Sequence, residues 1–122
     1  MSIENINKYS DVDDCPVRNV LDRIGDKWSM LVLLILNDNE VLRFNEIDKY
    51  IDTISQKMLS VTLKGLEADG LVKRTIYPQI PPRVEYQLTE RGKSLIPHLQ
   101  NLVIWAKDNI GDIKQSRIAY SS

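Results

Sequence analysis

The residue types that build catalytic and metal sites are scarce in this chain of 122 residues. It holds one cysteine, Cys15, and one histidine, His98. One chain therefore has neither an internal disulfide nor a cysteine-based zinc site, and nothing supports a Ser-His-Asp triad. A glycine-rich phosphate-binding loop is also missing from the sequence. These absences argue against an enzyme, a metal centre and a bound cofactor.

Long apolar segments are missing as well. The longest apolar run, residues 30–36, is far too short to span a bilayer. Residues 1–14 are polar and acidic and have no apolar core of the kind that a signal peptide needs. We therefore expect a cytoplasmic protein without membrane contact, and the single cysteine fits a reducing compartment.

The hydrophobic periodicity predicts two helices in the first third of the chain. Pro16 suits the first position of a helix, which makes Cys15 its N-cap, and Gly25 ends the apolar i, i+3, i+4, i+7 pattern. A second helix is expected from about Lys27 to Leu36. It is apolar on nearly all sides, which predicts that it is the central core helix.

The remaining sequence predicts a strand, two helices, a hairpin and a last helix. A short strand over 41–44 precedes a short helix with Asn45 as its N-cap, and Ser55 caps a further helix that ends at Gly70. Residues 72–77 and 83–88 alternate with period two around a proline-rich tip, which indicates a β-hairpin. Thr89 caps a helix that should end near Ile110, with a kink or break at Pro97.

This order of elements is typical of a winged helix-turn-helix. The predicted fold class is α+β, mostly α, with extra N- and C-terminal helices that form a dimer interface. The expected divisions are a flexible N-terminal segment over 1–12, one domain over 13–112 and a flexible C-terminal tail over 113–122.

The helix that Ser55 caps has an outer face suited to DNA. Its residues are small, polar or basic, whereas Leu59, Leu63 and Leu66 form an apolar stripe on the other side. Residues 55–93 carry 7 Lys and Arg against 4 Asp and Glu, a net +3, whereas residues 1–54 carry 6 against 11, a net −5. In a winged helix-turn-helix this second helix enters the major groove. The predicted DNA-binding residues are Ser55, Gln56, Lys57, Ser60, Val61, Lys64 and, in the hairpin, Arg83.

The chain resembles the HxlR-type winged-helix transcriptional regulators, which are relatives of the MarR group. The resemblance lies in "CPVRNVLDRIGDKW" (15–28), "RFNEI" (43–47), "ISQKML" (54–59), "LEADGLVKR" (66–74), "YPQIPPRVEYQLTERG" (77–92) and "SLIP" (94–97). It implies a homodimer that binds double-stranded operator DNA, with subunit contacts from the first and last helices. Some members of this family sense electrophiles or oxidants through a cysteine at the position of Cys15.

Two of the predicted site residues have a structural alternative. Arg83 follows two prolines, so a stiff hairpin would present it to the minor groove; alternatively it pairs with Glu85. At Cys15 a helix N-terminus, with Arg18 nearby, stabilises a thiolate, whereas Asp13 and Asp14 oppose it. The alternative is a buried, inert thiol.

Surplus apolar residues on the terminal helices predict a second copy of the chain as partner. They exceed what one small domain needs, and a two-fold dimer is the simplest arrangement that covers them. The predicted interface residues are Val17, Val20, Leu102, Ile104 and Trp105.

The favoured function is a homodimeric, sequence-specific regulator, most simply a repressor, with a possible thiol response at Cys15. The alternative is a winged-helix module that binds protein through the same surface and does not contact DNA. A protein-binding face is usually more apolar or aromatic than the outer face of the helix at 55–69. The sequence does not identify the operator or the effector.

Overall fold

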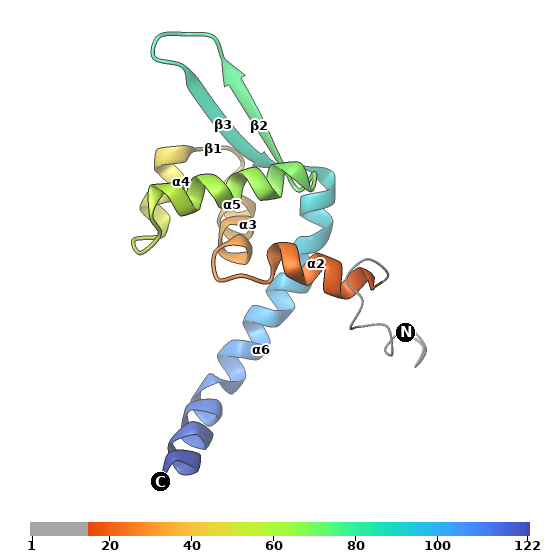
Figure 1. Ribbon diagram of the computed structural model, residues 1–122, viewed down its shortest axis with the longest axis vertical. Coiled ribbons are helices and arrows are strands. Elements are labelled where there is room, and N and C mark those ends of the chain that lie inside the picture. Colours follow the sequence, from red (N-terminus) through yellow and green to blue (C-terminus); the bar gives the residue numbers. More distant parts are fainter. Residues whose placement is uncertain (1–14) are drawn as a thin grey trace.

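The structure, a computed structural model, describes residues 15–122. Residues 1–14 lie outside the described part, and with them the predicted flexible segment 1–12 and the residues Asp13 and Asp14. The elements follow the predicted order: α2 (Pro16–Ile24), α3 (Ser29–Asp38), β1 (Leu42–Arg43), α4 (Phe44–Tyr50), α5 (Gln56–Ala68), β2 (Val72–Tyr77), β3 (Arg83–Leu88) and α6 (Glu90–Ser121). Figure 1 shows a helical body from which the β2–β3 hairpin and the end of α6 project in opposite directions.

The first two helices are fixed by local caps. Cys15 is the N-cap of α2, as predicted, and its Sγ accepts the N–H of Arg18 at 3.4 Å. The side chain of Asp26 stabilises the start of α3, because its Oδ1 accepts the N–H groups of Trp28 at 2.8 Å and Ser29 at 2.9 Å. The core lies under α3, whose buried apolar residues meet those of α5, β1, β3 and α6. It is formed by Ile24, Val32, Leu33, Leu36, Leu42, Ile47, Ile51, Ile54, Leu59, Leu63, Leu66, Leu71, Val72, Tyr86, Leu88, Ile96 and Leu99.

The helix-turn-helix pair consists of α4 and α5. The helix α4 begins two residues earlier than predicted: Arg43 and not Asn45 is its N-cap. The N–H of Arg43 donates to Oε1 of Glu46 at 2.8 Å, so the third residue of the helix reaches back to the N-cap. Ser55 caps α5 as predicted and accepts the N–H of Met58 at 3.0 Å.

The end of α5 is a glycine turn, as predicted. Gly70 has φ = 73°, the left-handed region in which a side chain is strained. The N–H of Leu71 then donates to the carbonyl of Leu66 at 3.0 Å, which satisfies an orphan carbonyl at the helix end and directs the chain into β2.

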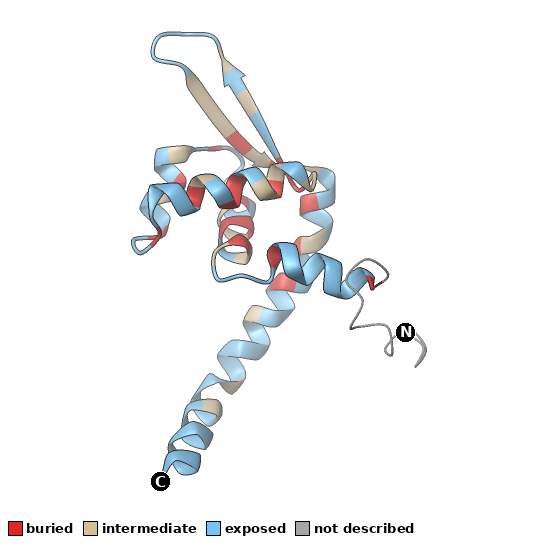
Figure 2. Cartoon of the chain, in the orientation of Figure 1, coloured by how far each residue is buried: buried red, intermediate tan, exposed pale blue. Residues whose placement is uncertain are grey.

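The wing is the β2–β3 hairpin, and both strands have their predicted bounds. The sheet order is β1-β3-β2, with all pairs antiparallel. Pairing runs from Val72 opposite Leu88 to Tyr77 opposite Arg83, so residues 78–82 project beyond the last pair. The strands are buried only near the helical body, as Figure 2 shows by the change from red to blue and tan along the hairpin.

The helix α6 corrects the prediction for the C-terminus. The predicted end near Ile110 is wrong, because α6 continues to Ser121 and so includes most of the segment 113–122 that was predicted to be a flexible tail. Residues 112–121 contain neither proline nor glycine, so nothing in their backbone chemistry stops the helix. The helix does not break at Pro97, but its axis changes direction between the cyan first turns and the blue remainder in Figure 1, which agrees with the kink that was the other predicted outcome.

The second half of α6 has no contact with the core. Its buried residues are Gly92, Ile96 and Leu99, and residues 100–121 extend from the body for about 33 Å at 1.5 Å per residue. Figure 2 shows this segment almost entirely in the colour of exposed residues. Within residues 15–122, no helix combines the length and the apolar character that a membrane crossing requires.

Candidate nucleic-acid interface

The helix α5 separates a buried face from an exposed one. Leu59, Leu63 and Leu66 are at most 2% exposed and pack into the core. The opposite face is open: Ser55, Gln56, Lys57, Val61 and Lys64 are exposed, and Ser60 is half-buried. The predicted residues of this helix therefore lie together on one accessible surface, with the N-terminal turn of α5 at one end.

One apolar residue of α5 lies outside the buried stripe. Met58 precedes Leu59 in the sequence but is 42% exposed. It lines a groove of about 430 Å³ between α5 and the α2–α3 turn, together with Val61 and Trp28. Trp28 is half-buried, and the Nζ of Lys27 lies 4.6 Å from its ring centroid. Met58 and Val61 of α5 thus line the same groove as Trp28 of the α2–α3 turn.

The wall of this groove is fixed by Asp26. Partial burial of its carboxyl acts to raise the pKa, but the hydrogen bonds from Ser29 and Trp28 outweigh it and hold the pKa of Asp26 below its usual value. The Ser29 hydroxyl also donates to Oδ2 of Asp26. The charged form of this carboxyl therefore stabilises the start of α3 at neutral pH.

Arg83 lies at the base of the wing tip and already contacts two side chains of the hairpin. Its guanidinium lies 4.2 Å from the ring centroid of Tyr77, the residue opposite it in the hairpin, and its Nε lies 3.5 Å from Oε2 of Glu85. The pairing with Glu85 that the sequence offered as the alternative is thus present. Contact between Arg83 and DNA stays a prediction, and it would use the nitrogens that point away from Glu85.

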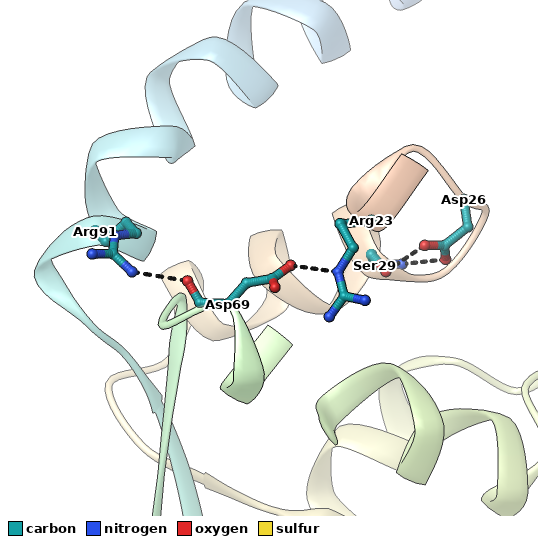
Figure 3. A network of polar contacts seen from close by, with 5 residues as sticks. All are labelled: Arg23, Asp26, Ser29, Asp69 and Arg91. Carbon is teal, nitrogen blue, oxygen red and sulfur yellow. Dashed lines mark hydrogen bonds and ion pairs between the residues drawn. The ribbon is translucent and has the colours of Figure 1, made fainter. Parts of the chain in front are cut away.

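Two ion pairs that the sequence analysis missed hold α5 in place. Nε of Arg74 on β2 lies 3.4 Å from Oε1 of Glu67, which ties the wing to α5. Nε of Arg23 on α2 lies 3.0 Å from Oδ2 of Asp69, the C-cap of α5, and an Nη of Arg91 donates to the Asp69 carbonyl at 2.9 Å. Figure 3 shows the two arginines approaching Asp69 from opposite sides. These contacts orient α5 relative to α2, the wing and α6.

The sequence matches a known family over most of its length. The family model described as HxlR-like helix-turn-helix matches residues 23–114. The chain belongs to this family. An uncharacterised HTH-type transcriptional regulator of Methanothermobacter thermautotrophicus is 48% identical over 113 residues, covering 88% of this chain and 86% of the relative. One of Halalkalibacterium halodurans is 45% identical over 102 residues, covering 84% and 90%.

Solved structures of similar sequence have the same fold. The redox regulator HypR in its reduced form has a TM-score of 0.77 and 40% identity, covering 82% of this chain and 98% of that one. The reduced form of the transcriptional regulator YodB from B. subtilis has a TM-score of 0.66 and 39% identity, covering 75% and 90%. The resemblance and the winged-helix fold predicted from the sequence are therefore confirmed, and these HxlR-like relatives are transcriptional regulators rather than enzymes.

The HxlR-like chain leaves apolar side chains uncovered on both terminal helices. On α2, Val17 and Val20 are 43% and 48% exposed. On α6, Leu102, Ile104 and Trp105 are 49%, 58% and 56% exposed. All five predicted interface residues are thus accessible in one protomer, as a subunit contact requires, and their role in a dimer stays a prediction.

Cys15 and His98 differ in their surroundings. Cys15 is free and buried at 2% exposure, at the very start of α2. His98 is exposed on α6. Among residues 15–122 no group of three or more His, Cys, Asp or Glu side chains is placed to hold a metal ion.

Proposed function

We propose that this HxlR-like chain is a homodimeric, sequence-specific DNA-binding regulator that represses transcription. Its α5 would occupy the major groove, and its wing would lie at the minor groove. The division of α5 into two faces carries the proposal. The leucines of the inner face, at most 2% exposed, fix the helix to the core. On the outer face Gln56 is exposed, and Lys57 and Lys64 form no ion pair in the described part of the chain.

The chemistry of that outer face suits base and phosphate contacts. A side-chain amide such as that of Gln56 pairs with adenine, and a lysine reaches guanine or phosphate. Val61 is 56% exposed and of a size to contact a thymine methyl group. The N–H groups of the first turn add an attraction for phosphate, since Ser55 accepts that of Met58 and no other side chain among residues 15–122 is seen to accept one there.

A dimer fits this function because two symmetry-related α5 helices read two half-sites about a helical turn apart. The exposed apolar side chains of α2 and α6 supply a surface for the two-fold contact. Repression is the simplest result of operator binding, because a dimer seated on a promoter excludes other proteins from it. Transcription from a template with and without the operator, at increasing protein concentration, tests the sign.

We also propose that Cys15 responds to oxidants or electrophiles. HypR, a structural relative, is a redox regulator. In this chain the Cys15 Sγ accepts the Arg18 N–H at 3.4 Å, and the Cys15 carbonyl accepts the Asn19 N–H at 3.0 Å. Modification of the sulfur would remove the cap of α2, a helix of the proposed dimer contact, and so alter the spacing of the two α5 helices.

The decisive experiment is selection of duplexes from a random pool, followed by mobility shifts at two salt concentrations. We expect Lys57→Ala to weaken binding to all duplexes and to reduce the salt slope by about one. Gln56→Ala should instead relax discrimination by about 1–3 kcal/mol at one base pair of each half-site. Lys107→Ala, an exposed lysine on α6, is the matched control and should bind as the wild type does. Failure of the wild type to bind any duplex at low salt would favour the protein-binding alternative.

A further inference from the structure

The wing tip is apolar and fully exposed. Five residues, Pro78–Pro82, lie beyond the last paired residues of the hairpin, and all five are exposed. Ile80 stands at their centre and is 101% exposed, so it has no contact with the rest of the chain. Three of its four neighbours in this tip are prolines, whose fixed φ angles limit the conformations of the loop. An apolar side chain is thus presented at the extreme end of a stiff projection, as Figure 1 shows for the hairpin as a whole.

The charged group of the wing lies behind this tip. Arg83 lies opposite Tyr77, where its guanidinium stacks on the ring and its Nε lies 3.5 Å from Oε2 of Glu85. When the hairpin approaches another molecule end-on, Ile80 arrives first and Arg83 follows at the rim. This order differs from the one expected from the sequence, in which Arg83 itself enters the groove.

The direction of the tip relative to α5 is fixed. The ion pair between Arg74 and Glu67 holds β2 against α5, and Leu71 and Val72 are buried where the hairpin joins the body. The hairpin carries Lys73, Arg74 and Arg83 against Glu85, a net +2 from three positive and one negative side chain. A positive hairpin with an apolar end suits a surface whose edges are negative and which offers stacked, apolar ring faces between them.

We propose that Ile80 is a wedge that enters the DNA minor groove and partly unstacks one base step. This inference rests on the proposed DNA-binding function and adds a residue and a mode of recognition to it. Apolar side chains, isoleucine and proline among them, unstack base steps in this way in several minor-groove proteins. The duplex has phosphates at the edges of the groove, where Arg83 at the rim of the tip can meet them, and base edges on its floor. Flexible pyrimidine–purine steps should accept the wedge best, so Ile80 would confer sequence preference without a hydrogen bond to a base.

The test uses a selected duplex with 2-aminopurine placed at successive steps under the wing, because this base fluoresces more strongly when it is unstacked. Wild-type protein should raise the fluorescence at one step of each half-site. Ile80→Ala should abolish the rise and weaken binding about tenfold per half-site, since a buried aliphatic side chain is lost. The salt slope should not change, because no charge is removed. Ile80→Leu should keep both properties, and Gln79→Ala, the exposed neighbour, is the matched control.

A second measurement separates the wedge from a loss of folding or of the proposed function. Replacing the unstacked step by a stiff A-tract step should weaken the wild type but leave Ile80→Ala unchanged. Wild-type affinity and fluorescence for Ile80→Ala would overturn the wedge while the DNA-binding function stood. If the wild type bound no duplex at all, the proposed function would fail first, which the mobility shift reports before any wing variant is made.

Discussion

Removal of the Trp105 side chain should dissociate the proposed dimer. Trp105 is 56% exposed in one protomer, and a whole tryptophan side chain offers about 250 Å², so about 140 Å² remains to be covered by a partner. At about 25 cal/mol per Å², covering that area contributes about 3.5 kcal/mol per protomer. The two symmetry-related copies together contribute about 7 kcal/mol as an upper limit, because association also has costs.

We expect Trp105→Ala to lose at least about 2 kcal/mol of this contribution, which raises the dimer dissociation constant about thirtyfold or more. Trp105→Asp should be monomeric, because it places an unpaired charge in the contact. Sedimentation equilibrium over a range of concentrations measures both, and operator affinity should fall in parallel.

The matched control is Tyr50→Ala on α4. Tyr50 is 57% exposed, almost the same as Trp105, but it lies on an element outside the proposed contact. Its variant should sediment as the wild type does. A Trp105→Asp protein that remains folded and fully dimeric would refute the role given to α6, and equal losses for the Trp105 and Tyr50 variants would show that the effect is not specific to the interface.

Three further predictions concern Asp26, two glycines within helices, and Cys15. Hydrogen bonds lower the pKa of Asp26 in the folded protein. The stability that this carboxylate contributes is therefore present above the pKa of the unfolded state and is lost as the pH falls through the pKa of the folded state. Urea midpoints measured from pH 7 to about pH 3 should drop more for wild type than for Asp26→Asn. Gly92→Ala should unfold the domain or lower its free energy of unfolding by several kcal/mol, because the added Cβ would lie 2.2 Å from the Leu71 carbonyl oxygen. A Cβ at Gly65 would have no atom within 4 Å, so Gly65→Ala should stabilise α5 by about 0.5–1 kcal/mol in the same urea titrations. A mild thiol oxidant should reduce operator binding by wild type but not by Cys15→Ser, and identical binding of both proteins before and after oxidation would leave Cys15 as a packing residue.

The elements that the sequence predicted well are those with a local signal. The caps Cys15, Ser55 and Thr89, the left-handed Gly70 and both hairpin strands each depend on residues within a few positions of one another. The predicted N-cap Asn45 was wrong, although asparagine is a good cap residue. The helix begins two residues earlier, where the N–H of Arg43 donates to the side chain of Glu46.

Residues 111–121 of α6 were missed because helix prediction from hydrophobic periodicity depends on a buried stripe. Beyond Leu99 this helix has no core of its own chain to pack against, so the periodic signal weakens although the helix continues. The polar contacts at Asp69 were missed for another reason. They join residues 46 and 22 positions apart in sequence, and no local pattern encodes such a pairing.

The contacts of Asp69 with Arg23 and Arg91 join the end of α5 to α2 and to the first turn of α6, so a movement of α6 is passed on to α5. In the proposed dimer the free part of α6, residues 100–121, is about 33 Å long and leaves the body nine residues after Arg91. With its far end held by the partner, a rotation of about 5° about that end displaces the body, and α5 with it, by about 3 Å, close to the 3.4 Å rise of one base pair. A small tilt of α6 would thus shift each α5 by nearly one base pair relative to an operator.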